Sequence, residues 1–248
     1  MNVAFAAVVF APALAIGSFL NVVASRWPLG RSIVRPRSAC PHCDNEIRSR
    51  DNVPVVSYLL LRGRCRSCRA SISWRYPAVE LGTALLTVAC FVVWGPGFRA
   101  LAGAVFCAAL ITISATDIEF RIVPNKVVLP ATGVVLGLQL AWHPSLVWIA
   151  AALGAALFLF LLALAYPRGL GMGDVKLALL LGVGVGRYVP IAILGGSLFA
   201  LLPSAILFAR HGGAARKMAI PFAPFLAAGG LLALFFGQPI MDWYLKFV

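Results

Sequence analysis

Charged residues are scarce in this chain. Asp and Glu number 8 and Lys and Arg number 21, so 12% of the 248 residues are charged, whereas 61% are hydrophobic. A soluble domain carries about a quarter of its residues as charges, so the composition excludes an ordinary soluble globular protein. We therefore expect an all-α polytopic membrane protein, with about eight transmembrane helices and a small cysteine-rich, zinc-binding cytoplasmic insert.

Apolar windows of about the 20 residues that cross a bilayer give the expected positions of these helices. The first window has no basic segment before it and no clear small-residue cleavage site before Arg26, so it is interpreted as a retained span rather than a signal peptide. An eighth window, 172–187, is short and glycine-rich. The other seven lie near 3–25, 76–95, 98–116, 126–142, 146–166, 188–209 and 219–238.

Basic residues are concentrated on one side of this expected topology. With eight alternating spans, the loops 26–75, 117–126, 167–176 and 210–217 share a side and hold 18 of the 21 Lys and Arg. By the positive-inside rule this side is cytoplasmic, and both termini are periplasmic. The net charge of +13 is therefore interpreted as a topology signal. The bilayer is the expected surrounding, and no nucleic-acid partner is expected.

Three domains are expected: a first transmembrane helix at 1–25, a polar insert at 26–75 and a helical transmembrane domain at 76–248. The insert contains two CxxC pairs, Cys40 with Cys43 and Cys65 with Cys68. Such pairs present four thiolates to a tetrahedral Zn²⁺ ion. Two disulfides, redox chemistry and free thiols are the alternatives, although a reducing compartment disfavours disulfides. A zinc ion held by Cys40, Cys43, Cys65 and Cys68 would be structural, since no position stays open for a substrate.

The remaining cysteines and several glycines have simpler interpretations. His42 is expected on the surface of the first CxxC turn rather than as a fifth ligand. Cys90 and Cys107 lie inside apolar windows and are expected to be small packing residues. Small residues also allow close helix approach, and this is the role expected for Gly133 with Gly137 and for Gly195 with Gly196.

Two aspartates stand out because acids are so few. Asp117 and Asp174 each lie where an apolar window meets a turn on the basic side. Ionisable groups in such places are costly to desolvate and are functional candidates. A pair of carboxylates can hydrolyse a peptide, because one activates water as a base and the other, protonated, polarises the carbonyl. We therefore predict that Asp117 and Asp174 are catalytic.

Taken singly, each aspartate has a structural alternative. Asp117 could pair with Arg121 one helical turn later, and Asp174 could cap the helix that follows it. Glu119 would point elsewhere on a continuing helix. The turns next to the aspartates break the helices and let a peptide backbone approach. The residues expected near the substrate are Pro124, Asn125, Gly171, Gly173 and Lys176.

Glu80 is a separate candidate, because it lies inside the second apolar window, shortly after Arg75. Two interpretations are open for a single carboxylate there. It is either paired with an arginine in a structural role, which we favour, or placed at a cofactor site. No glycine-rich cofactor loop of a recognised type accompanies it.

The chain resembles the prepilin peptidases, the type IV leader peptidases of pilus assembly and type II secretion. The resemblance covers nearly the whole length. The two departures from the usual pattern are Val53 and Val123, where isoleucine is common. The matching segments are GSFLNVV at 17–23, SIVRPRS at 32–38, DNVPVVSY at 51–58, LRGRCRSC at 61–68, ISWRYPAVE at 72–80, Asp117 with IVPN at 122–125, and GMGDVK at 171–176.

This resemblance implies an aspartic endopeptidase of the bacterial inner membrane that uses Asp117 and Asp174. Its substrates would be prepilins or pseudopilins, cut at the cytoplasmic face after the glycine that ends a short basic leader. Many members then methylate the new N-terminal amine with S-adenosylmethionine, and the CxxC insert accompanies this bifunctional form. The alternatives are a membrane-embedded N-methyltransferase without proteolysis, and a zinc-dependent anchor for a secretion assembly.

Overall fold

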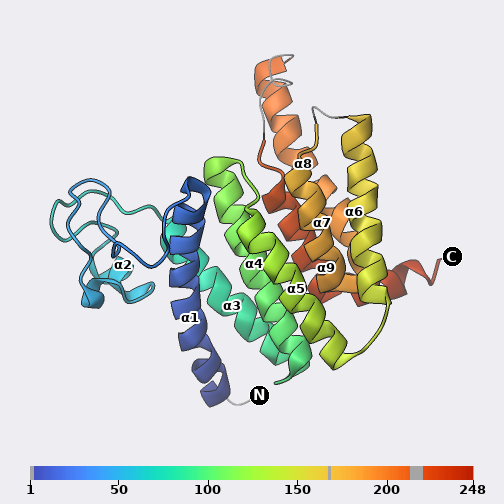
Figure 1. Cartoon of the computed structure of the whole chain (residues 1–248), viewed down its shortest axis with the longest axis horizontal. Helices are drawn as coiled ribbons and strands as arrows, with labels where there is room; N and C mark the ends of the chain where they lie inside the picture. Colours follow the sequence, from blue (N-terminus) through green and yellow to red (C-terminus); the bar gives the residue numbers. More distant parts are fainter. Residues whose placement is uncertain (1–2, 167–168, 213–219, 248) are drawn as a thin grey trace. The chain divides into compact units, whose positions relative to one another are not determined.

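A computed structural model describes residues 3–166, 169–212 and 220–247 (Figure 1). This part of the chain is helical and contains no β-strand, only two isolated β-bridges in the insert. The helices are α1 (Val3–Arg26), α2 (Val56–Leu60), α3 (Arg75–Trp94), α4 (Phe98–Phe120), α5 (Asn125–Trp142), α6 (Val147–Ala165), α7 (Met172–Val185), α8 (Val189–His211) and α9 (Ala223–Tyr244).

The long helices match the eight expected windows, so the all-α polytopic fold is confirmed. By length and composition, six stretches of the described residues can cross a membrane, and one of them, Met172–His211, is 40 residues long. It contains both α7 and α8, with a single turn of 3₁₀ helix between them. The protein is therefore a multi-pass membrane protein, and α7 is the short glycine-rich helix that its sequence indicated.

The chain divides into two compact units, Met1–Pro96 and Gly97–Val248. In the first unit α1 and α3 cross closely, because a side chain at Gly17 would lie 2.7 Å from the Cα atom of Glu80. The same contact brings the Asn21 amide to the carbonyl of Tyr76, at 3.0 Å. The predicted domain boundaries after residues 25 and 75 follow function rather than compactness. They therefore stay a prediction.

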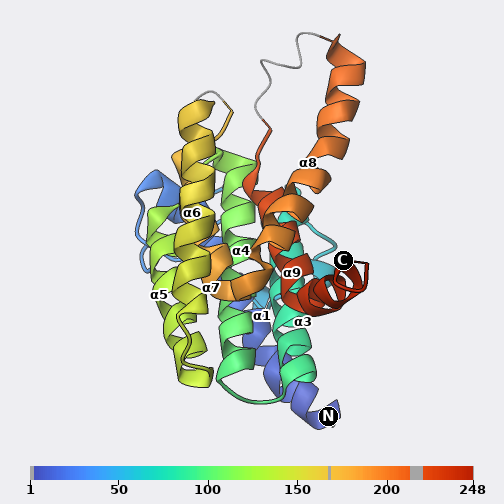
Figure 2. The same ribbon diagram turned by 90° about the vertical axis from the view of Figure 1, so that its right-hand side faces the viewer.

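The second unit has one apolar core, to which all of its helices, α4 to α9, contribute buried side chains. Glycine allows close approach at two helix pairs that Figure 2 shows side by side: a side chain at Gly182 would collide with the α6 backbone at Ala152, and one at Gly229 with the α8 backbone at Ala192. The largest fully buried side chains here are Phe106, Leu110, Ile113, Leu177, Leu180, Leu181 and Leu226.

The expected roles of the other glycines are only partly correct. Gly196 lies against α9, where a side chain would come within 2.9 Å of Leu226, and Gly195 meets Leu232, so their packing role is confirmed. The prediction for Gly133 and Gly137 is wrong. A side chain at either would meet no described atom within 4 Å, because both lie on an exposed face of α5. A GxxxG spacing marks a helix contact only where a second helix comes near.

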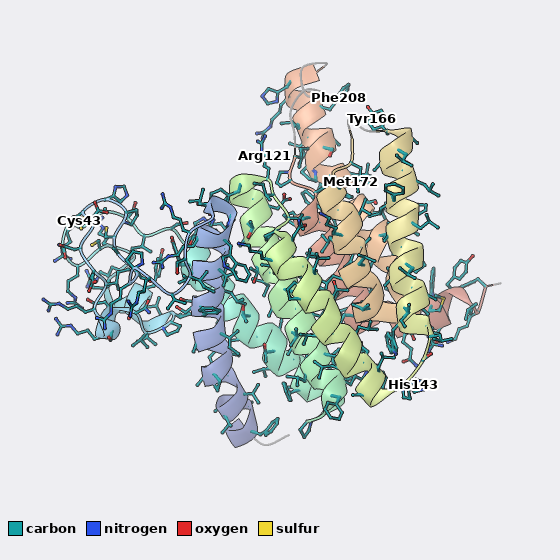
Figure 3. All side chains as sticks on the ribbon, in the orientation of Figure 1. Cys43, Arg121, His143, Tyr166, Met172 and Phe208 are labelled. Carbon is teal, nitrogen blue, oxygen red and sulfur yellow. The ribbon has the colours of Figure 1, made fainter. Side chains whose placement is uncertain are left out.

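Turns that carry functional candidates share one end of the second unit. Figure 3 places Arg121, at the α4–α5 turn, and Met172, at the start of α7, at the same end, whereas His143 lies at the opposite end. This is the arrangement that alternating spans require. Three basic residues used in the topology argument, Arg168, Arg216 and Lys217, lie outside the described residues.

Candidate active site and metal centre

Asp117 lies in the last turn of α4 and is 7% exposed. Its Oδ2 accepts a hydrogen bond of 3.1 Å from the backbone N–H of Ala223, the first residue of α9. Orphan N–H groups at a helix start favour a carboxylate, so α9 holds this side chain in place. Among the described residues, none donates a hydrogen bond to its Oδ1, which is left for water or substrate.

Asp174 is the third residue of α7 and is half-buried. Its Oδ2 accepts the N–H of Gly171 at 3.2 Å, and its own N–H donates to the carbonyl of Gly171 at 3.0 Å. These reciprocal bonds fix the first turn of α7 and the direction of the carboxylate. The N-cap of the helix is Gly171. The alternative in which Asp174 is itself the N-cap is therefore wrong, because Asp174 occupies the third position of the helix.

The pairing alternative for Asp117 is not found either. In the part of the chain that the structure describes, ion pairs join Arg37 to Glu46 and Arg66 to Asp51, and none joins Arg121 to Asp117. Arg121 instead ends α4 in a left-handed conformation, φ 55° and ψ 40°, and its N–H bonds to the Asp117 carbonyl at 2.9 Å. Its side chain is exposed, and Glu119 is also exposed.

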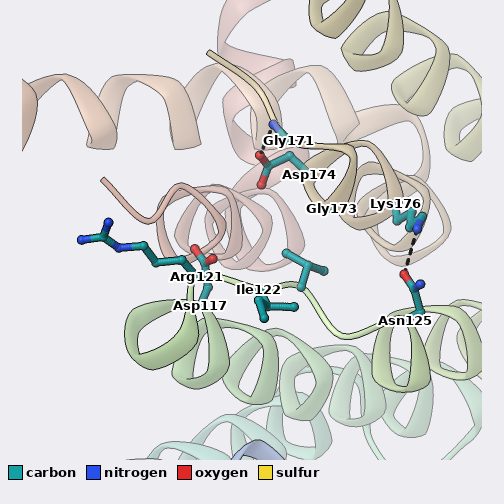
Figure 4. A pocket seen from close by; sticks show the side chains of 9 residues that line it. Asp117, Arg121, Ile122, Asn125, Gly171, Gly173, Asp174 and Lys176 are labelled. Atoms are coloured by element: carbon teal, nitrogen blue, oxygen red, sulfur yellow. Dashed lines mark hydrogen bonds between the residues drawn. The ribbon is translucent and has the colours of Figure 1, made fainter. Parts of the chain in front are cut away.

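Both aspartates line one cavity of about 320 Å³ in the second unit. In Figure 4 Asp174 reaches the cavity from the start of α7 and Asp117 from the end of α4. A hydrogen bond of 2.9 Å from Lys176 Nζ to Asn125 Oδ1 ties α7 to α5 beside them. The cavity is lined by Asp117, Arg121, Ile122, Val123, Asn125, Gly171, Gly173, Asp174 and Lys176.

Most of the residues expected near a substrate are therefore brought together. Pro124 is buried as the N-cap of α5 and is not among the lining residues. Three lining residues, Arg121, Ile122 and Val123, were not among the residues expected near the substrate. The Ala223 N–H was missed as well, and no sequence signal could have given it, because it lies 106 positions from Asp117.

Gly173 explains how the start of α7 reaches the α4–α5 turn. An added side chain there would lie 2.9 Å from Val123 Cβ and 3.0 Å from its Cγ2, which is closer than carbon atoms pack. Gly171 is different, because its nearest neighbour would be Asp174 Oδ2 at 3.6 Å. In the GMGD segment, therefore, only Gly173 has no room for a side chain.

The four cysteines of the insert form one cluster. All four sulfur atoms lie within 4.8 Å of one another, and Cys40 Sγ is 3.7 Å from Cys68 Sγ. The cysteines are free thiols in this structure, so the disulfide alternative is not supported. Zn–S bonds of about 2.3 Å in a tetrahedron give sulfur–sulfur edges of about 3.8 Å. The cluster therefore has the size and donor set of a closed metal site, and exposed His42 is not part of it.

The two CxxC turns have the same backbone design. The N–H of Asp44 bonds to the Cys40 carbonyl at 2.9 Å, and the N–H of Arg69 bonds to the Cys65 carbonyl at 3.0 Å. Asp44 and Arg69 both have left-handed φ angles, 53° and 62°. An isolated β-bridge closes each turn, Ala39 with Glu46 and Arg64 with Ser71. Two equivalent turns thus present two sulfurs each.

Backbone donors act on these thiols unequally. The N–H groups of Cys68 and Ser67 hydrogen-bond to Cys65 and lower the pKa of its thiol to about 6. For Cys43, the N–H of Asn45 acts to lower the pKa, but partial burial and the three neighbouring sulfurs outweigh it and raise the pKa to about 12. One sulfur of the cluster is thus prepared as a thiolate, the form that binds a metal.

Glu80 is buried at 8% exposure, and its Oε2 accepts the N–H of Val55 at 2.8 Å. The expected arginine partner is not found among the described residues. Val55 has φ 61° and ψ −48°, a strained conformation for a β-branched residue. Glu80 lines a second cavity, of about 690 Å³, within the first unit. Cys90 and Cys107 are fully buried in α3 and α4, which agrees with a packing role.

Comparisons with known proteins agree with this arrangement of a paired-carboxylate site and a cysteine-rich insert. Residues 12–94 match the model of the bacterial peptidase A24 N-terminal domain, and residues 104–205 match that of the type IV leader peptidase family. No solved structure matches the chain significantly.

Several curated relatives carry the name prepilin leader peptidase/N-methyltransferase. The relative from Burkholderia pseudomallei (strain 1026b) is 36% identical, over 96% of this chain and 87% of its own length. That from Bacillus subtilis (strain 168) is 34% identical, over 96% and 97%. That from Pseudomonas aeruginosa PAO1 is 36% identical, over 94% and 91%. The chain belongs to the type IV leader peptidase family, as its motifs indicated.

Proposed function

We propose that this protein is a prepilin leader peptidase, an aspartic endopeptidase of the bacterial inner membrane that also methylates the new N-terminus. The observation that supports cleavage most directly is the convergence of Asp117 and Asp174 on one cavity at one end of the second unit. The family and the names of relatives that match along nearly their full lengths support the substrate class.

In the proposed cleavage, one aspartate is ionised and takes a proton from a water molecule. The water oxygen then bonds to the scissile carbonyl carbon, while the second, protonated aspartate donates a hydrogen bond to the carbonyl oxygen. Collapse of the tetrahedral intermediate breaks the C–N bond, and the leaving amine takes up the proton that the first aspartate had taken from water. The helix starts of α7 and α9 hold the two carboxylates ready for this step.

The turn residues lie beside the proposed path of the substrate. Gly171 and Gly173 both line the cavity next to Asp174, where an extended peptide backbone is proposed to lie. Asn125 and Lys176 are bonded to each other across the same cavity and are proposed to flank the bound peptide. Because the insert is rich in arginine, the apolar segment of the substrate, rather than its basic leader, is proposed to guide binding among the helices.

Sidedness and cofactors complete the proposal. We place the cavity and the insert on the cytoplasmic side, because the basic loops adjoin them. The metal held by the four cysteines is proposed to be zinc, which a set of four thiolates favours. S-adenosylmethionine is proposed as the methyl donor: the amine nitrogen bonds to the methyl carbon, the S–CH₃ bond breaks with its electron pair left on sulfur, and the amine loses a proton. The predicted domains 1–25, 26–75 and 76–248 remain part of this proposal.

The test is incubation of the purified protein with a prepilin, followed by mass spectrometry of the new N-terminus. We expect Asp117→Asn and Asp174→Asn each to lower cleavage by at least about 10²–10⁴-fold, the usual contribution of a general acid or base. Glu119→Gln is the matched control on α4, since Glu119 does not line the cavity. Full cleavage by either Asp→Asn variant contradicts the proposed roles.

A non-proteolytic methyltransferase and a zinc-dependent anchor are the rival functions, and the family assignment favours neither. The same mass spectra separate them. An added methyl on a synthetic, already cleaved pilin, without any cleavage of the prepilin by the wild-type protein, would indicate the first. A protein that still holds its metal, but neither cleaves a prepilin nor methylates a cleaved pilin, would indicate the zinc-dependent anchor.

A further inference from the structure

The cavity of the carboxylate pair also contains an ammonium group. Lys176 lies in the second turn of α7, is half-buried, and lines the same cavity as Asp117 and Asp174. It belongs to the 40-residue stretch Met172–His211 that is apolar enough to cross a membrane, and it is the only charged residue between Asp174 and Arg187. A charge in such a stretch is costly to desolvate and indicates a functional role.

The partner that the structure gives Lys176 is neutral. Its Nζ donates a hydrogen bond of 2.9 Å to the side-chain carbonyl of Asn125. Among the described residues, both ion pairs lie in the insert, and no carboxylate is paired with Lys176. An ammonium group has three N–H donors, of which Asn125 occupies one. The charge and the remaining donors of Lys176 are therefore left for a ligand.

The other cations near this cavity are placed differently. Arg121 lines the cavity too, but its side chain is exposed, and in Figure 4 it extends away from Asp174 and Lys176. Lys126 is exposed and does not line the cavity. Asn125 is the first residue of α5, so the positive end of that helix adds to the potential at the Lys176 ammonium. Lys176 is thus the lining cation that a hydrogen bond holds in place, beside a helix start.

The proposed cleavage creates an anion where there was none. A peptide bond is neutral, and its hydrolysis leaves a carboxylic acid on the leader and an amine on the mature pilin. A terminal carboxyl has a pKa of about 3.3–3.7 and a terminal amine of about 7.7–8.0, so at neutral pH the acid loses its proton and the amine gains one. The leader then ends in a carboxylate beside the ionised member of the aspartate pair. Like charges in a poorly hydrated site repel, so this product needs a cation.

We propose that Lys176 and Asn125 form the binding site for the new C-terminal carboxylate of the released leader. The ammonium supplies the charge, and the Asn125 amide supplies further N–H donors. The site draws the carboxylate away from the aspartates, which separates the two products and makes the free leader an inhibitor. The inference rests on the proposed cleavage and adds where one of its products is held.

A pair of synthetic peptides isolates the contact to the carboxylate. Both have the leader sequence of the prepilin used in the cleavage assay and end in its glycine, one as the free acid and the other as the amide. Because they differ only at this terminus, all other contacts of the leader contribute equally to both. The ratio of their Kd values therefore measures the charge-assisted contact, and we expect the wild type to favour the acid by at least about tenfold.

Variants identify the cation that is responsible. Lys176→Met keeps the apolar stem without the charge, and its acid-to-amide preference is expected to vanish. Lys176→Arg keeps a positive charge and is expected to retain most of the preference. Lys126→Met is the matched control, because it removes the lysine that follows Asn125, outside the cavity lining, and its preference is expected to equal that of the wild type. A purely structural bond between Lys176 and Asn125 would change both affinities alike and leave their ratio unchanged.

The measurement is competition of each unlabelled peptide with a leader acid that carries fluorescein at its amino end. Binding to the full-length protein in neutral detergent is followed by fluorescence polarisation. Equal binding of acid and amide by the wild type, or an unchanged preference in Lys176→Met, overturns the inference. A preference that is lost in Arg121→Met but kept in Lys176→Met assigns the carboxylate to Arg121 and overturns it as well.

Lipid phosphate is a second possible source of the anion. The competition is therefore repeated in vesicles that contain phosphatidylglycerol, where we expect the preference for the acid to persist. Its loss in these vesicles would show that Lys176 binds the lipid phosphate, and would overturn the inference. The proposed function is tested separately: a wild-type protein that cleaves prepilin but binds both peptides equally refutes the carboxylate site alone, whereas a wild-type protein that cleaves no prepilin refutes the proposed function.

Discussion

The contact between Gly173 and Val123 gives a quantitative test of how the cavity is built. In Gly173→Ala the new methyl carbon would start 2.9 Å from Val123 Cβ and 3.0 Å from Cγ2. Carbon atoms pack at about 3.5–4.0 Å, so the start of α7 and the α4–α5 turn must separate by about 0.6–1.1 Å. The carboxylate of Asp174 moves with α7, because its bonds to Gly171 fix it to that first turn.

A displacement of this size is large on the scale of catalysis. Misplacing a reacting group by about 1 Å can cost about 10²-fold in rate, so we expect kcat/KM of Gly173→Ala for prepilin cleavage to fall about 10²-fold. Gly171→Ala is the matched control. Its methyl would lie 3.6 Å from the nearest atom, and its backbone, φ −85° and ψ 151°, suits alanine. We expect its kcat/KM to stay within about twofold of the wild-type value.

The assay is the rate of leader release from a purified prepilin in detergent, quantified by gel or mass spectrometry. The zinc content measured in each variant serves as a check on the fold of the insert. Val123→Gly in the Gly173→Ala background removes both colliding carbons and is expected to restore part of the activity. Equal activities of Gly171→Ala and Gly173→Ala, whether high or low, would refute the spatial argument.

The remaining predictions concern the metal and the helix contacts. Replacing Cys65 with serine is expected to lower bound zinc from one ion per chain to near none by plasma mass spectrometry, whereas the same change at buried Cys107 leaves it unchanged; zinc retained by the first variant would exclude the proposed ligand set. In metal-free protein, Cys65 is expected to be alkylated faster than Cys43 at pH 7, because the pKa of Cys65 is lowered to about 6 and that of Cys43 is raised to about 12. Acid protonates the Cys65 thiolate, so its alkylation rate should halve near pH 6. A rate that stays constant between pH 5 and 8 would contradict this. Gly229→Ala forces the backbones of α8 and α9 apart. This overpacking costs about 1–3 kcal/mol and should lower Tm by roughly 2–12 °C. Gly133→Ala places its methyl group in open space and should leave Tm unchanged, so equal Tm values for the two variants would count against the observed helix contact.

Local features of the sequence were sufficient to predict the helices and the four-cysteine cluster. A membrane helix needs about 20 consecutive apolar residues, and this requirement can be read without knowing the neighbours of the segment. The CxxC turns are similar, because each places two sulfurs through bonds within a few residues, such as Asp44 to Cys40. Alternating spans also indicated that Asp117 and Asp174 share one end.

The partners of these residues were decided only by the tertiary structure. Asp117 is held by the N–H of Ala223, from a helix far along the chain. Asp174 stands at the third position of α7, because Gly171 and not Asp174 begins the helix. Glu80 bonds to strained Val55 rather than to an arginine. Each of these contacts depends on which segments come within hydrogen-bonding distance, a property that no single segment contains.

Glycine spacing shows the same limit. The GxxxG of Gly133 and Gly137 faces no other helix, whereas Gly229 and Gly182, at less distinctive spacings, are where helix backbones meet. The sequence by itself determined that this is a membrane protein of many helices, with a four-cysteine cluster of the kind that can hold a metal and two exceptional aspartates, because composition and short-range geometry set those features. The tertiary structure decided which helices approach closely and what lines each cavity, because both follow from the packing of the whole fold.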